Sequence, residues 1–118
     1  MLRRALRIVG KCRIILCGVA TIDNTMKRVS IIAGGIVQGV CFRYYAQRKA
    51  EELGLTGWVR NIPDGRIEAV IEGRDQAVDR MVQWFRHGPP GAQVDECTVS
   101  EQSYRGEYND FRVKAYWQ

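Results

Sequence analysis

The chain of 118 residues is 46% hydrophobic and 26% charged, which is typical of one globular domain and unlike disordered or fibrous chains. No stretch approaches the roughly 18 consecutive apolar residues of a membrane-spanning helix, so we expect no membrane partner. The net charge of +5 lies mainly in residues 1–25, with five basic side chains against one acidic, and the near-neutral remainder is a poor basis for binding nucleic acid.

Residues 1–25 differ in pattern from the rest of the chain: they are Arg-rich, contain a short apolar run at 14–20, and turn polar before Met26. The segment is a targeting leader, a native extension, or sequence upstream of a true start at Met26. We favour the third interpretation, because the apolar run is marginal for a leader and regular patterning begins directly after Met26. We therefore predict a disordered or non-native extension at 1–25 and one domain at 26–118.

The first predicted elements are a strand and a helix separated by glycines. Residues 29–33 alternate between apolar and other positions, which predicts a strand with one apolar face. Three glycines between 34 and 39 then interrupt regular structure. Apolar residues recur at helical spacing over 42–53, and Gly54 is well placed to end that helix.

A hairpin is predicted next. Thr56–Asn61 has the composition of a strand, and residues 62–65 read Ile-Pro-Asp-Gly, which has strong turn chemistry. Residues 66–72 alternate again, so we expect a third strand that closes the hairpin.

The second half of the chain predicts one more helix and two more strands. Asp75 is expected to cap the helix, whose apolar stripe runs over 78–85. Extended segments follow at 94–99 and at 111–116, with a polar loop at 103–110. The order is strand, helix, strand, strand, helix, strand and a further strand, which predicts an α+β, ferredoxin-like α/β sandwich with two helices on one face of an antiparallel sheet.

The segment from Gly34 to Arg43 joins the first strand to the first helix and has the chemistry of an anion site. Its glycines let the backbone turn tightly, so that several N–H groups converge near the positive end of the helix. Arg43 adds a permanently charged guanidinium that suits phosphate oxygens. As a bare pattern the signal is weak, because it matches neither the dinucleotide fingerprint nor the Walker pattern.

Asn61 is a second candidate site residue. In the split arrangement the first and second strands run parallel with the third between them, so the glycine loop and the end of the second strand share one edge of the sheet. An amide at that position can both accept from and donate to a water molecule, and can therefore orient the water for attack.

Two runs of residues carry a resemblance to a known family. The first is Val-Gln-Gly-Val-Cys-Phe-Arg at 37–43, and the second is Gly-Leu-Thr-Gly-Trp-Val-Arg-Asn at 54–61, followed by Asp64 and Gly65. Together they look like the signature of the acylphosphatase family, and the resemblance runs from about residue 27 to residue 116.

The resemblance implies an acylphosphatase that hydrolyses the carboxyl–phosphate bond of acyl phosphates to a carboxylate and inorganic phosphate, without metal or cofactor. In that family the loop arginine and loop amides bind the phosphate and the asparagine positions the water; the matching positions are Arg43 and Asn61. The implied phosphate-binding loop consists of Gln38, Gly39, Val40, Cys41, Phe42 and Arg43. Ile36 departs from the family, which commonly has a basic residue there, and this departure is expected to weaken substrate attraction.

The sequence offers little for a metal site, because His87 is the only histidine and the four cysteines lack paired spacing. We expect reduced thiols in a cytoplasmic protein, with Cys41 as a buried or half-buried filler of the loop. The expected partners are a small-molecule acyl phosphate and, as competitors, inorganic phosphate and other anions. We expect a monomer.

Two rival functions remain open at this point. A ferredoxin-like nucleic-acid-binding module would need aromatic rings on the central strands, and the first and third predicted strands offer only aliphatic residues there. A regulatory domain that binds a phosphate without hydrolysing it would keep the same loop, and phosphate release from benzoyl phosphate separates it from an enzyme.

Overall fold

The structure is a computed structural model that describes residues 25–115. The predicted extension at 1–25, apart from Thr25, and the end of the last predicted strand at Tyr116 lie outside the described residues. Seven elements follow one another, in the predicted order: β1 (Met26–Ile36), α1 (Phe42–Glu52), β2 (Thr56–Asn61), β3 (Ile67–Arg74), α2 (Asp75–His87), β4 (Gln93–Gln102) and β5 (Phe111–Lys114).

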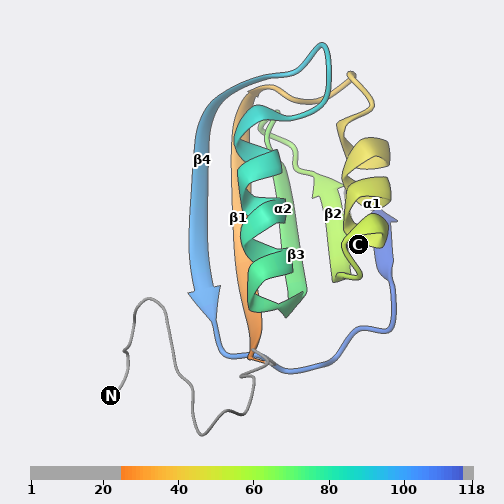
Figure 1. The fold of residues 1–118 in the computed structure, drawn as a ribbon. Helices are drawn as coiled ribbons and strands as arrows, with labels where there is room; N and C mark the ends of the chain where they lie inside the picture. Colours follow the sequence, from red (N-terminus) through yellow and green to blue (C-terminus); the bar gives the residue numbers. More distant parts are fainter. Residues whose placement is uncertain (1–24, 116–118) are drawn as a thin grey trace, which may run out of the picture.

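The strands form one sheet in the order β4-β1-β3-β2-β5. All neighbouring pairs are antiparallel except β2 and β5, which are parallel. Strands β1 and β2 therefore run in the same direction on either side of β3, as predicted. Both helices cover one face of the sheet, α2 over β1 and β3 and α1 over β2 (Figure 1), which confirms the ferredoxin-like arrangement.

Neither helix of the described part, of 11 and 13 residues, has the length and apolar character needed to span a bilayer.

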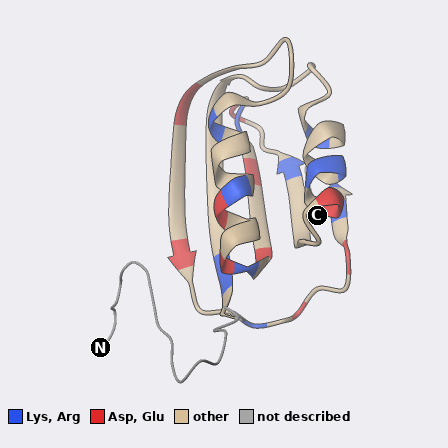
Figure 2. Ribbon diagram, in the orientation of Figure 1, with Lys and Arg blue, Asp and Glu red and all other residues tan. Residues whose placement is uncertain are grey.

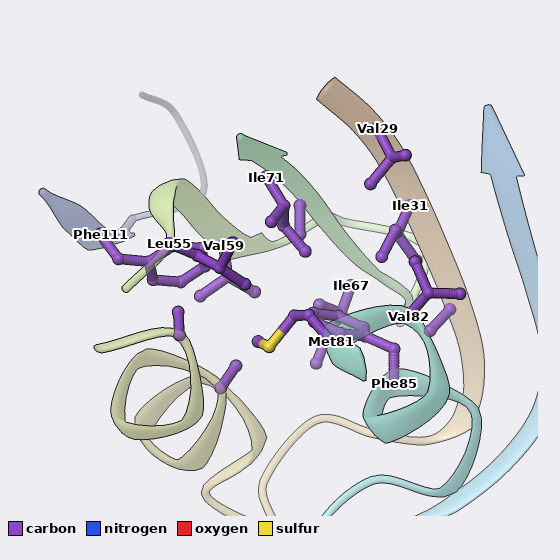
Figure 3. Packing of buried hydrophobic residues seen from close by; sticks show 14 of the residues in the cluster. Val29, Ile31, Leu55, Val59, Ile67, Ile71, Met81, Val82, Phe85 and Phe111 are labelled. Atoms are coloured by element: carbon purple, nitrogen blue, oxygen red, sulfur yellow. The ribbon is translucent and has the colours of Figure 1, made fainter. Parts of the chain in front are cut away.

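The core lies between the helices and the sheet (Figure 3). Strand alternation turns Ile31, Ile67 and Ile71 toward the helices, and each is completely buried. The predicted stripe of α2 supplies Met81 and Phe85 to the same core, also completely buried. Burying a side chain of this size stabilises the fold by roughly 1.5–3 kcal/mol, and this rigid layer holds the ends of β1 and β2 in place.

The predicted cap of α2 was wrong by one residue. Arg74 occupies the N-cap position in extended conformation, and no side chain caps the helix. Asp75 is the first helical residue; its backbone N–H donates to the Thr25 carbonyl at 3.0 Å and its carboxylate lies 3.4 Å from Lys27 Nζ. The shift arises because β3 continues into α2 without a loop, which leaves the extended cap position to the last strand residue.

A buried charge, Glu72 of β3, anchors the loop that leads into β5. Its carboxylate accepts the backbone N–H groups of residues 105, 106 and 107 at 2.9–3.2 Å. It also accepts Arg28 Nη1 at 3.1 Å. Burial by itself raises the pKa of this carboxyl, but the Arg105 N–H and the Arg28 guanidinium outweigh burial and hold the pKa below its ordinary value of 4.5. The cluster fixes the route by which the chain reaches β5.

Candidate active site

The loop between β1 and α1 turns through two left-handed residues. Gly39 has φ of 78°, and Cys41, the N-cap of α1, has φ of 61°. Cys41 is the only non-glycine residue of 25–115 with positive φ. A left-handed conformation costs an ordinary residue roughly 1–2 kcal/mol, and such strain is concentrated at functional sites. The thiol is exposed, which corrects the expectation of a buried or half-buried filler, because the left-handed turn points the side chain outward rather than into the core.

The N-terminal end of α1 has the properties of an anion site. The Tyr45 N–H donates to the Cys41 carbonyl at 3.1 Å and closes the first turn, so the preceding helical N–H groups have no partner within the helix. No side chain caps this end and no acidic residue lies in the first turn. The acidic residues of α1 lie at its C-terminal end, away from the cavity-facing start of the helix (Figure 2). A positive helix end without an internal anion favours an external one.

A cavity of about 500 Å³ opens at this helix end. It lies where the glycine loop, the start of α1, the last residue of β2 and the exposed edge strand β5 meet. The lining residues are Val37, Gly39, Cys41, Phe42, Arg43, Tyr44, Gln47, Asn61 and Val113. The structure thus brings the predicted pair Arg43 and Asn61 together on one cavity, and its size is within the usual range of small-ligand sites, roughly 300–1,000 Å³.

The Arg43 guanidinium is half-buried and is not neutralised by a carboxylate of the described chain. Its recorded contact is a long hydrogen bond of 3.4 Å from Nη1 to the Lys114 carbonyl of β5. A guanidinium carries five N–H donors, so most of its donors stay available for a ligand. Such a group favours a planar, oxygen-rich anion such as a phosphoryl group.

Asn61 ends β2, where it pairs with Ile67 of β3. Its side-chain Oδ1 is buried and has no hydrogen-bond partner in the described structure. Leaving a buried acceptor unpaired costs about 1–3 kcal/mol, so such an atom in a cavity wall indicates a binding function. A water molecule or a ligand N–H or O–H group would satisfy it.

Gln38 of the predicted phosphate-binding loop does not line the cavity, and its side chain contacts the β2–β3 turn. Its Nε2 donates to the carbonyls of Ile62 and Arg66, both at 2.9 Å. These carbonyls flank the β2–β3 turn that directly follows Asn61. Gln38 therefore ties the glycine loop to the strand end that carries Asn61, and its contribution to the loop is to hold the two halves of the site in register.

The β2–β3 turn is itself well ordered by local hydrogen bonds. The Arg66 N–H donates to Asp64 Oδ1 at 3.1 Å, and its Nη2 lies 2.6 Å from Asp64 Oδ2. The Arg66 hydrogen bonds hold the pKa of the Asp64 carboxyl below its usual range. The turn chemistry predicted for residues 62–65 thus provides a fixed anchor for Gln38.

Sequence reasoning missed the contribution of β5 and of two residues on α1. Val113 lines the cavity, Gln47 Nε2 donates to the Phe111 carbonyl at 3.0 Å, and Tyr44 forms part of the wall. The only signal in the sequence was the helical spacing that puts residues 43, 44 and 47 near one another; nothing local places β5 beside β2.

No acidic side chain lines the cavity. Within residues 25–115, no group of three or more potential metal-ligating side chains comes together. Ile36, the departure from the family pattern, is 55% exposed and does not line the cavity.

The chain matches known proteins over nearly the whole of the described fold. The Acylphosphatase family model matches residues 29–113. An acylphosphatase from Methylococcus capsulatus is 53% identical over 88 residues, which cover 75% of this chain and 96% of the relative. A solved acylphosphatase from Coxiella burnetii matches with a TM-score of 0.72 and 38% identity, over 75% of this chain and 93% of that one. A solved acylphosphatase from Bacillus subtilis matches with a TM-score of 0.72 and 34% identity, over 76% of this chain and 99% of that one.

Proposed function

The chain belongs to the acylphosphatase family, and on that premise we propose a mechanism in which Arg43 binds the phosphoryl group and Asn61 orients the attacking water. The protein hydrolyses the carboxyl–phosphate bond of acyl phosphates, releasing a carboxylate and inorganic phosphate. The backbone N–H groups of residues 39–43, at the start of α1, join Arg43 in holding the phosphoryl oxygens.

The proposed reaction is an in-line displacement at phosphorus. The water oxygen forms a bond to phosphorus, the bond from phosphorus to the acyl oxygen breaks, and its electron pair leaves with the carboxylate. The water protons pass to the phosphate and to solvent. Carboxylic acids ionise with pKa values near 4, so the leaving group needs no proton at neutral pH. Positioning and charge stabilisation can therefore supply most of the catalysis.

The observation that carries the proposal is that two groups with unused hydrogen-bonding capacity line one cavity. Arg43 is a half-buried cation without a carboxylate partner in the described chain. Asn61 offers a buried acceptor without a hydrogen-bond donor. A phosphoryl group satisfies the first and a water molecule satisfies the second.

The test is hydrolysis of benzoyl phosphate in the presence of EDTA. We expect Arg43→Ala to raise KM and lower kcat, and Asn61→Ala to lower kcat by about a hundredfold to a thousandfold with a smaller change in KM. Arg80→Ala and Asn109→Ala remove the same side chains from exposed positions outside the cavity and serve as controls. Near-normal turnover by Asn61→Ala would show that the assigned role is wrong.

The same site accounts for the competing ligands that we propose. Inorganic phosphate carries the oxygens that Arg43 and the loop amides bind, so it is expected to inhibit competitively and to protect against thermal unfolding. We also propose that the protein acts as a monomer. Gel filtration at assay concentration tests the monomer, and an increase of kcat with protein concentration would contradict it.

A further inference from the structure

The cavity is larger than the reacting groups require. A water molecule occupies about 30 Å³ in the liquid, and a phosphoryl group is only a few atoms larger, whereas the cavity measures about 500 Å³. If Arg43 and Asn61 hold the phosphoryl group and the water, as proposed above, the remaining space faces the acyl group. The chemistry of that remaining wall therefore bears on which acyl phosphates are preferred.

Tyr44 forms one side of this wall. It is 52% exposed, although it lies beside Arg43 on the cavity. Its ring is held in position by neighbours on α1: Arg48 Nη1 donates to the hydroxyl at 3.1 Å, and the Tyr45 ring packs edge-on with centroids 5.3 Å apart. The Arg48 guanidinium carbon lies over the ring, 5.7 Å from its centroid. The structure thus holds a partly exposed aromatic ring next to the phosphate-binding residue.

Val113 of β5 forms another side. It pairs with Val59 of β2, two residues before Asn61, and projects toward the helix layer. It is nevertheless 39% exposed, whereas Val59 is completely buried. When an apolar ligand group covers an exposed aliphatic side chain on a cavity wall, both lose contact with water, and this stabilises the complex.

We propose that Tyr44 and Val113 form the acyl-binding surface of this enzyme, and that it prefers acyl phosphates with an aromatic or bulky apolar acyl group over those with a short one. Arg43 is the one charged residue of the cavity wall, and in the proposed mechanism it is engaged by the phosphoryl group. No second cation lines the cavity to attract a carboxylate on the acyl chain. An edge-to-face or stacked contact with the Tyr44 ring adds to apolar burial for an aromatic acyl group.

The experiment compares kcat/KM for benzoyl phosphate and for acetyl phosphate in each variant. The ratio of the two values removes the intrinsic reactivity of each substrate from the comparison between variants. We expect the ratio to fall about tenfold in Tyr44→Ala and about threefold in Val113→Thr, mainly through KM for benzoyl phosphate. Val113→Thr keeps the β-branched shape that a strand favours, so it tests apolarity without disturbing β5.

Tyr104→Ala is the matched control, because Tyr104 is 44% exposed on the β4–β5 loop and does not line the cavity. Its ratio is expected to equal that of the wild type. Benzylphosphonate and methylphosphonate, which are not hydrolysed, provide a second readout: Tyr44→Ala should weaken inhibition by the first and not by the second.

An unchanged ratio in both Tyr44→Ala and Val113→Thr would overturn the acyl-binding inference while leaving the proposed function intact. Retained turnover in Arg43→Ala would overturn the proposed function instead. The ratio of the two substrates decides the acyl-binding inference in either case.

Discussion

Replacing Glu72 by glutamine removes the charge at the centre of the cluster that anchors the β4–β5 loop. The wild-type carboxylate accepts four hydrogen bonds, three from backbone N–H groups of 105–107 and one from Arg28. Glutamine keeps one acceptor oxygen, but its NH₂ group then faces at least one backbone N–H donor. The hydrogen bonds that remain also lose their charge assistance.

The expected cost follows from the environment of the two charges. Removing one partner of a buried ion pair destabilises a protein by about 3–5 kcal/mol. We expect the lower end, about 3 kcal/mol, because Arg28 keeps its contact with Glu107 at 2.6 Å. For a domain of this size, that change corresponds to a fall in Tm of about 12–24 °C.

Thermal and urea unfolding, followed by circular dichroism, measure the effect. Asp79→Asn makes the same carboxyl-to-amide change in an exposed pair with Lys27. It should cost under about 1 kcal/mol, because Lys27 also keeps Asp75 at 3.4 Å. If Glu72→Gln costs no more than Asp79→Asn, the buried cluster does not stabilise the fold as argued.

Three further predictions follow from other contacts. The lowered pKa of Glu72 predicts that the wild-type free energy of unfolding falls as pH drops below about 4.5, because an unfolded chain binds the proton first; Glu72→Gln should show a flatter pH dependence in urea titrations. Gln38→Leu should lower kcat about tenfold to a hundredfold with little change in phosphate inhibition. Gln102→Leu, which loses a 2.7 Å hydrogen bond between residues that do not line the cavity, should leave kcat unchanged. Gly57→Ala should unfold the protein or cut its soluble yield sharply, because a Cβ there would lie 1.9 Å from the Val70 carbonyl oxygen and φ is +135°.

Much of the fold was accessible from local spacing. The alternation at 29–33 and 66–72 predicted strands. The first range lies within β1, and the second begins one residue before β3 and otherwise lies within it. The predicted second strand, Thr56–Asn61, coincides with β2. The errors concern positions where a neighbouring element decides the outcome: Asp75 is displaced as the cap because β3 runs directly into α2, and Cys41 is exposed because the loop turns left-handed at that residue.

The candidate site also has a part that the local sequence predicted and a part that only tertiary contacts decided. Arg43 and Asn61 were identified from the loop motif and the strand end, and the strand order explains why they meet on one cavity. The side-chain direction of Gln38 could not be predicted, since its two acceptors lie 24 and 28 residues away in the chain. The long-range hydrogen bonds that hold the loop belong to the tertiary structure.

The sequence by itself determined the elements, their order, and the chemistry of the glycine loop, because these depend on residues two to four positions apart. Only the tertiary structure decided that β5 lies parallel to β2, so that Val113 enters the cavity wall and the Lys114 carbonyl reaches Arg43. These contacts join residues 54 and 71 positions apart and form only when the whole core is packed. No local pattern encodes them, and the wall that faces the acyl group depends on one of them.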